Sequence, residues 1–237
     1  MAGVRLVRRL VSRHQRERTG LFVCEGEDLV EAALEAGLVP EAALVDSARP
    51  VDVPGGELVD PAVIAELSSL AHPPRVIAVF RRDDLPRGME RPIGLALWQV
   101  GDPGNVGTLL RVADAFGAFV ALSPGCADPT GPKALRASVG SVFRVPTCSF
   151  DEAPGRRIGL VAHGGEPLDR LELGSGTTTF VLGAEREGLP ADVPCDARAT
   201  IPTAGPAESL NVAAAGAIAL YELARRRATK TVSSPPE

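Results

Sequence analysis

Short apolar runs alternate with segments of helical periodicity over the first 80 residues. Residues 21–23, 42–45 and 76–80 are apolar and short, which is typical of buried strands. Residues 27–36 place apolar side chains on one face and end at Gly37, which predicts a helix with a glycine stop. A second helix is expected at residues 61–70. The pattern predicts a compact α/β unit over residues 1–80.

A second α/β pattern begins after the charged, proline-broken stretch RRDDLPRGMERP at residues 81–92, which we interpret as a linker. Apolar runs predict strands at residues 93–100, 119–122, 158–162 and 178–182. Helices are expected at residues 105–116, 133–137 and 209–227. This alternation favours a mostly parallel sheet covered on both faces. We expect the second domain to span residues 93–229 and residues 230–237 to be a flexible tail.

Three loops of this second domain carry candidate chemistry. They are DPGNVGTLLR (residues 102–111), LGAEREGLP (182–190) and IPTAGPAESLN (201–211). In open parallel sheets, ligands bind at the carboxyl ends of the strands. The three loops are therefore expected to meet at one edge of the sheet.

Charge is unevenly distributed along the chain. The 237 residues carry a net charge of −5, which argues against a bulk nucleic-acid binder. Residues 1–18, however, hold six arginines and one glutamate. This basic arm fits a local anionic partner, and a solvated helix face is an equal alternative.

Several classes of site are excluded by missing signatures. The sequence has no phosphate loop, no nucleophile elbow, and glycines spaced G-x-x-G-x-x-G rather than in the dinucleotide pattern. The four cysteines and three histidines are scattered, so we expect reduced, mostly buried thiols and no metal. No apolar run could span a bilayer and no signal peptide is evident, so no membrane partner and a cytoplasmic location are expected.

Each loop also has an ordinary structural interpretation. Asn105 can cap the helix that follows it, with Arg111 a solvated helix residue, and the loop after Gly183 can be a simple strand-end turn. The proline-rich third loop could grip a flat ligand such as adenine through its backbone. The Ala-rich helix after it has small side chains at i, i+3, i+4, i+7, which fits either a core face or a homodimer contact.

The three loops together, in this order, resemble the motifs of the SpoU/TrmH family of RNA ribose 2′-O-methyltransferases. The first is similar to N-x-G-x-x-x-R, the second to G-[SA]-E-x-x-G-[LM] and the third to I-P-M-x-G-x-x-x-S-L-N-V, with Thr203 in place of Met. The segment LRASVGSVFRVPT (135–147) resembles the stretch between motifs. Residues 1–80 look like the L30e-like substrate-binding domain of many members.

This resemblance implies a fold and a reaction. The fold would be α/β, with a mostly parallel sheet, a C-terminal trefoil knot, and a smaller L30e-like domain before it. S-adenosyl-L-methionine would be the cofactor, RNA the partner, and the enzyme a homodimer through the knotted domain. No metal is required for the transfer.

The resemblance also implies residue roles. The catalytic set would be Arg111, Asn105, Glu185, Ser209 and Asn211. The cofactor-binding set would be Leu182, Gly183, Ile201, Pro202, Thr203 and Leu210. The basic arm would bind RNA through Arg5, Arg8, Arg9, Arg13, Arg16 and Arg18.

The predicted function is methylation of a ribose 2′-hydroxyl, with 23S ribosomal RNA favoured over transfer RNA. Arginine is permanently protonated and a poor base, so Arg111 and an RNA phosphate are expected to polarise the hydroxyl together. The alternatives are a tRNA 2′-O-methyltransferase, a catalytically retired RNA-binding protein of the same fold, and a small-molecule α/β enzyme that shares the architecture only.

Overall fold

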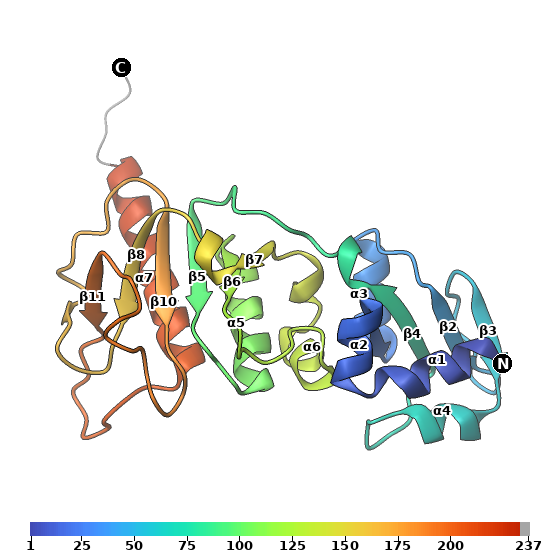
Figure 1. Ribbon diagram of the computed structural model, residues 1–237. Helices are drawn as coiled ribbons and strands as arrows, with labels where there is room; N and C mark the ends of the chain where they lie inside the picture. Colours follow the sequence, from blue (N-terminus) through green and yellow to red (C-terminus); the bar gives the residue numbers. More distant parts are fainter. Residues whose placement is uncertain (233–237) are drawn as a thin grey trace. The chain divides into compact units, whose positions relative to one another are not determined.

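The computed structural model describes residues 1–232, and the chain divides into two compact units. Unit 1 comprises Met1–Pro86 together with Asp128–Arg144, and unit 2 comprises the remainder. The expected boundaries, which place all of residues 93–229 in one domain, stay a prediction. The packing differs from them because residues 128–144 cluster with unit 1. Figure 1 labels most of the helices and strands of both units.

Unit 1 contains a four-stranded sheet of order β1-β4-β2-β3. β4 runs antiparallel to both β1 and β2, and only β2 and β3 are parallel, so this sheet is mixed. Its strands are β1 (Leu21–Glu25), β2 (Ala42–Asp46), β3 (Gly56–Val59) and β4 (Val76–Arg81). Its helices are α1 (Ala2–Leu10), α2 (Arg13–Thr19), α3 (Glu27–Glu35), α4 (Pro61–Leu67), the 3-10 turns η1 (Arg82–Asp84) and η2 (Ser141–Phe143), and α6 (Pro132–Ser138).

Alternation along the strands of unit 1 gives the sheet two buried faces. On one face, Ile77 and Val79 of β4 pack with Val7 and Leu10 of α1 and Ile64 of α4. On the other face, the rings of Phe22, Phe80 and Phe143 lie together, with centroids 6.0 and 6.3 Å from Phe22. Residues far apart in the sequence therefore complete this second core.

Asp128–Arg144, the returning segment of unit 1, is also anchored to the rest of the unit by charge. The buried Arg16 donates from Nε to Asp128 Oδ2 (3.1 Å) and from Nη1 to the carbonyls of Leu10 and Val11. Arg82 donates to the same carboxylate oxygen at 2.8 Å. Burial would raise the pKa of Asp128, but the hydroxyl of Thr130 and the two guanidinium groups outweigh it and hold the pKa below its usual value.

Unit 2 contains a seven-stranded sheet of order β7-β6-β5-β10-β8-β11-β9, and every pairing in it is parallel. The expected mostly parallel α/β sheet is thus confirmed here. The strands are β5 (Ile93–Leu97), β6 (Phe119–Leu122), β7 (Thr147–Ser149), β8 (Arg156–Leu160), β9 (Glu166–Pro167), β10 (Thr178–Leu182) and β11 (Ala197–Thr200). The helical elements are α5 (Pro103–Ala115), η3 (Phe150–Glu152) and α7 (Val212–Val232).

Helices α5 and α7 pack against each other and against the strands of one sheet face. A Cβ at Gly216 of α7 would lie 2.5 Å from Leu109 Cδ2 of α5, so the small residue permits this close contact. The opposite face packs Phe119, Val181 and Phe150 with Val193 of the loop after β10. The Ala-rich helix was expected to present either a core face or a homodimer contact. The core face is present within a single chain.

The final helix is shifted from its expected bounds. It begins at Val212 rather than residue 209 and continues to Val232, so it extends into the segment 230–237 that was expected to be a flexible tail. Residues 233–237 of the predicted tail lie outside the described residues. Within the described part of the chain, no helix combines the length and apolarity needed to cross a membrane.

Candidate active site

Three loops leave the sheet of unit 2 at its carboxyl edge, after β5, β10 and β11. β5 and β10 are neighbours, with Leu97 opposite Leu182, and Trp98 N donates to Leu182 O at 2.8 Å. Parallel strands end together, so the loop after β5 and the loop after β10 begin side by side.

Glu185 joins the first two loops. Its carboxylate accepts hydrogen bonds from Gly101 N (3.2 Å), Asp102 N (3.1 Å) and Asn105 Nδ2 (2.9 Å). Burial alone would raise the pKa of Glu185, but these bonds favour the charged form and hold the pKa below its usual value. The side chain is therefore an ionised anchor for the turn that precedes α5.

Asn211 joins the third loop to the same group. Its Nδ2 donates to Asn105 Oδ1 at 3.0 Å, while its Oδ1 accepts from Ala213 N and Ala214 N at the start of α7. Asn211 is thus the side chain that caps α7. With its amide donating to Glu185 and its carbonyl accepting from Asn211, Asn105 is the middle member of a continuous hydrogen-bonded chain.

Two members of the expected catalytic set are not part of this chain. Arg111 is exposed on α5, six residues after Asn105, or about 9 Å further along the helix axis. Ser209 is exposed in the loop before α7. Within residues 1–232, neither side chain makes a hydrogen bond to Asn105, Glu185 or Asn211. Their catalytic roles stay a prediction.

The expected cofactor residues lie on the loops after β10 and β11. Leu182 and Gly183 are buried at the end of β10, and a Cβ on Gly183 would lie 2.1 Å from the backbone carbon of Gly188. Ile201 is half-buried, whereas Pro202, Thr203 and Leu210 are exposed. In the described chain, the backbone of residues 202–210 makes no hydrogen bond to other segments. Exposed backbone donors and acceptors fit a purine that is held without charged side chains.

Asp102 is a contributor that the sequence interpretation did not single out. Its Oδ1 accepts from Asn105 N at 3.0 Å, so it caps α5, and Pro103 follows at the first helical position. Asp followed by Pro at the start of an apolar-periodic segment is a helix-start signal. Asn105 therefore does not cap α5, and its side chain is free to bond Glu185 and Asn211.

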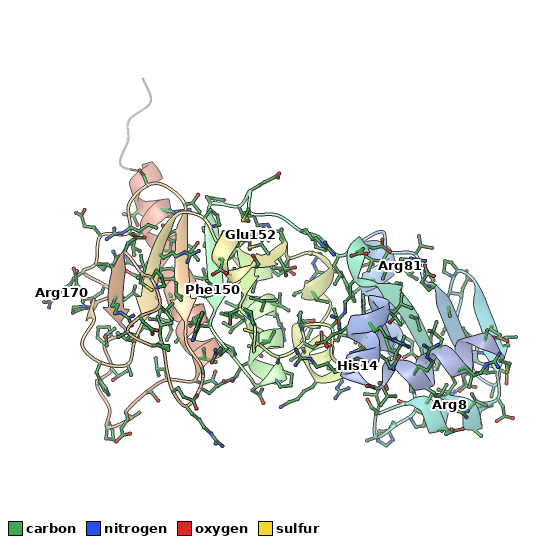
Figure 2. The ribbon with its side chains drawn as sticks, viewed as in Figure 1. Arg8, His14, Arg81, Phe150, Glu152 and Arg170 are labelled. Carbon is green, nitrogen blue, oxygen red and sulfur yellow. The ribbon has the colours of Figure 1, made fainter. Side chains whose placement is uncertain are left out.

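The basic arm lies on α1 and α2 of unit 1, where Figure 2 labels Arg8 and His14. Arg5, Arg9 and Arg18 are exposed. Arg8 forms an ion pair with Glu66 at 2.7 Å, and Arg13 forms one with Glu17 at 2.7 Å. These five positions remain predicted RNA contacts.

Arg16 requires a correction. It is only 6% exposed, and its guanidinium is committed to Asp128 and to two backbone carbonyls. A buried arginine whose guanidinium is bonded inside the fold cannot reach an RNA phosphate. Arg16 is therefore a structural residue of unit 1 and not an RNA contact.

The described residues hold no group of three or more His, Cys, Asp or Glu side chains that could bind a metal ion. All four cysteines are free; Cys24 and Cys126 are buried, and Cys148 and Cys195 are half-buried. Burial raises the pKa of the Cys148 thiol to about 11, so this thiol stays protonated at neutral pH.

Comparison with known families covers most of both units. Residues 92–221 match the SpoU rRNA Methylase family, and residues 2–78 match the MRM3-like substrate binding domain.

Two named relatives align over nearly the whole chain. A 23S rRNA (guanosine(2553)-2′-O)-methyltransferase of Bacillus subtilis is 33% identical over 233 residues, covering 91% of this chain and 93% of the relative. A 23S rRNA (uridine(2479)-2′-O)-methyltransferase of Streptomyces viridochromogenes is 30% identical, covering 96% of this chain and 90% of the relative.

Solved structures agree with this assignment. The SpoU methyltransferase AviRb of Streptomyces viridochromogenes, in complex with the cofactor AdoMet, has a TM-score of 0.82 at 27% identity and covers 99% of this chain and 100% of its own. An AdoMet-bound rRNA methyltransferase of Sinorhizobium meliloti has a TM-score of 0.81 at 28% identity, with 94% of each chain covered. The expected family is confirmed: the chain belongs to the SpoU rRNA methylase family and carries an MRM3-like substrate-binding domain before its methylase region.

Proposed function

We propose that this protein transfers a methyl group from S-adenosyl-L-methionine to a ribose 2′-hydroxyl of 23S ribosomal RNA. The observation that carries the proposal is the hydrogen-bonded chain Glu185–Asn105–Asn211, which ties the three motif loops into one site. Relatives named as 23S rRNA 2′-O-methyltransferases align over more than nine-tenths of the chain, and structural neighbours hold AdoMet.

The loops after β10 and β11 are the proposed donor site. When bound there, S-adenosyl-L-methionine supplies a methyl group that is already electrophilic through its sulfonium charge. The residues that would hold it are Leu182, Gly183, Ile201, Pro202, Thr203 and Leu210. The exposed, unpaired backbone of residues 202–210 supports this assignment because backbone groups can bind adenine edges directly.

The remaining side chains of the site position the hydroxyl. Arg111 cannot act as a base, because its guanidinium is always protonated. Its role in the proposal is to bind an RNA phosphate and, with it, to polarise the 2′-hydroxyl while Ser209 contacts the ribose. Glu185, Asn105 and Asn211 fix the loops that place donor and acceptor in line, which is the main requirement of the transfer.

Unit 1 is the proposed RNA-holding unit. Arg5, Arg9 and Arg18 are exposed on α1 and α2, and their charge would bind phosphates without reading sequence. Arg8 and Arg13 would have to leave exposed ion pairs, which cost little to break.

A homodimer and a trefoil knot belong to the same proposal. One side of α7 buries Ala213, Gly216 and Leu220, whereas Ile218 is 39% and Tyr221 59% exposed on another side. An exposed apolar stripe beside a buried one supports a second copy of the chain as its cover.

The test is methyl transfer from labelled S-adenosyl-L-methionine into unmodified 23S and transfer RNA transcripts by the full chain. The wild type is expected to label 23S RNA, and nucleoside mass spectrometry should find the methyl on the ribose 2′-oxygen. Arg111→Ala should lower turnover at least about a hundredfold while calorimetric donor binding persists. The exposed Arg170, which projects from the loop after β9 (Figure 2), supplies the control Arg170→Ala, with unchanged turnover.

Three outcomes would contradict parts of the proposal. Methyl label found only in transfer RNA would mean that the substrate is transfer RNA and not 23S ribosomal RNA. Normal turnover of Arg111→Ala would remove this residue from the reaction. Donor binding without transfer into free transcripts or into ribosomal particles would indicate a retired RNA-binding protein.

A further inference from the structure

Unit 1 contains a hollow of about 540 Å³ that the proposed methyl-transfer site does not use. Its walls are the start of α3, the stretch of residues 70–75 before β4, and the end of α6 in the returning segment. The volume is in the range of small-ligand pockets and larger than one purine base.

Charged side chains that already have bonding partners hold the walls of the hollow in place. Glu25 accepts from Ser68 Oγ (2.9 Å), Ser69 N (2.7 Å) and Ser69 Oγ (2.8 Å), so it fixes the loop after α4. Arg75 is paired with Glu27. These side chains build the hollow and leave little capacity for a ligand.

Two charged side chains of the lining are not committed in this way. Asp28 is exposed and makes no hydrogen bond or ion pair with any residue from 1 to 232. Arg136 makes a single long hydrogen bond, from Nη1 to Ser69 Oγ at 3.3 Å. The hollow thus offers one carboxylate acceptor pair and one guanidinium donor fork.

The rest of the lining is apolar and includes a strained residue. Val139 is 55% exposed and has a φ of 49°, in the left-handed region that β-branched residues rarely adopt. Leu29, Leu70 and Pro73 add further apolar surface. Strain held at an exposed apolar position is a common mark of a binding surface, here one that suits the flat face of a ring.

We propose that this hollow binds an unpaired guanine base of the RNA substrate, with Arg136 and Asp28 as the residues that specify it. Guanine presents two acceptors, O6 and N7, that match an arginine fork, and donors N1–H and N2–H₂ that match a carboxylate. Adenine lacks O6, and the pyrimidines lack N7. The base must be unpaired, because its Watson–Crick edge faces Asp28. The proposal rests on RNA being the substrate and adds a base-reading site outside the loops that bind the donor.

The test is fluorescence anisotropy of the full chain with the end-labelled single-stranded RNAs UUUGUUU and UUUAUUU. The wild type is expected to bind the guanine oligomer about tenfold more tightly, since a well-placed bidentate contact discriminates at that level. Asp28→Asn and Arg136→Gln should each bring the ratio close to one. Arg170→Gln should leave it unchanged, and circular dichroism checks the fold of each variant.

A base analogue separates the two contacts. Inosine lacks the N2 amino group, so replacing guanine by inosine should weaken wild-type binding and have no further effect in Asp28→Asn. In Arg136→Gln, the same replacement should still weaken binding.

The proposal is overturned if the wild type binds the two oligomers equally or binds neither, or if the ratio is unaltered in both variants. These results are distinguishable from failure of the proposed function. A guanine preference without methyl transfer into 23S RNA would sustain this inference and refute the reaction. Methyl transfer into 23S RNA without a guanine preference would sustain the reaction and refute this inference.

Discussion

Glu185 is the residue on which the site geometry depends most, through its carboxylate. It accepts from two backbone amides and from the side chain of Asn105, so all three donors point at one charged group. Bonds to a charged acceptor are stronger than neutral ones. A change of this residue therefore affects the entry to α5 and the contact with Asn211 together.

Glu185→Gln should lower the free energy of unfolding at pH 7 by about 1–2 kcal/mol, since an amide NH₂ group replaces an acceptor oxygen opposite an N–H donor. Urea denaturation measures the change. The matched control is Glu187→Gln, an exposed neighbour in the same loop. Equal losses in the two variants would contradict the special position of Glu185.

The low pKa of Glu222 predicts that unit 2 loses stability in acid. The hydrogen bond from Arg225 and, to a smaller extent, the one from Arg226 lower the pKa of Glu222 to about 2. Arg226 also donates to the carbonyls of Leu168 and Leu171, so the charged Glu222 helps to hold α7 on the loop after β9.

A lowered pKa stabilises the fold above the ordinary glutamate pKa near 4.5, and this contribution disappears as the pH falls toward 2. The wild type should exceed Glu222→Gln in unfolding free energy by about 1–2 kcal/mol at pH 7, after allowance for solvent screening. The difference should shrink as the pH falls below 4.5 and be mostly lost by pH 2, where about half of the Glu222 carboxyls of the folded protein are protonated. Urea titrations at pH 7, 3.5 and 2 measure it, and a constant difference would contradict the assignment.

At the scale of elements, the turn after β10 is the most constrained loop of the site. Gly188 N donates to Ala184 O at 2.9 Å, and the backbone of residue 188 lies against Gly183. Arg198 of β11 donates to the carbonyls of Pro190 and Ala191, which fixes the far end of the same connection. Neither close neighbour of Gly183 is a flexible side chain that could move away.

Gly183→Ala should therefore destabilise unit 2 by about 2 kcal/mol or more and weaken donor binding, because its Cβ would lie 2.1–2.3 Å from backbone atoms of residues 188 and 189. Gly176→Ala is the matched control, since a Cβ there has nothing within 4 Å. Thermal unfolding and calorimetric titration with S-adenosyl-L-methionine measure both effects. A Gly183→Ala protein that binds the donor normally would contradict the tight-turn argument.

At the scale of the molecule, sequence periodicity located the elements with a strong internal pattern. The strands at residues 119–122 and 178–182 agree with the structure, because FVAL is a short apolar run and TTFVL combines β-branched and apolar residues. The pattern does not predict β3, because its sequence GELV has only two apolar residues, Leu58 and Val59, after Gly56 and Glu57. β11, with the sequence ARAT, is short and partly polar and was missed for the same reason.

Long-range pairing set the limit of the sequence interpretation. The burial of Arg16 depends on Asp128, which is 112 positions away, and no local pattern distinguishes Arg16 from the exposed arginines beside it. The mixed pairing in unit 1 likewise arises because β4 inserts between β1 and β2. Motif order did place Asn105, Glu185 and Asn211 in adjacent loops, and the structure joins them by hydrogen bonds.

The proposed homodimer gives a prediction at this scale. Ile218→Glu with Tyr221→Asp should shift the molar mass in light scattering from two chains to one, because both side chains are exposed and apolar on α7. Arg170→Glu, on an exposed loop, should leave the mass unchanged. A wild type that is monomeric at micromolar concentration would contradict the dimer.

The return of residues 128–144 to unit 1 has a consequence for how the protein is made. During synthesis the ribosome must release the first 86 residues, then some forty residues of unit 2, before Asp128 and Phe143 emerge. Until then the Arg16 guanidinium lacks its carboxylate and the rings of Phe22 and Phe80 lack a cover. The amino-terminal unit therefore cannot finish folding on the nascent chain until the first stretch of unit 2, Arg87–Ala127, has been synthesised. A fragment ending at residue 86 should expose apolar surface that the full chain conceals.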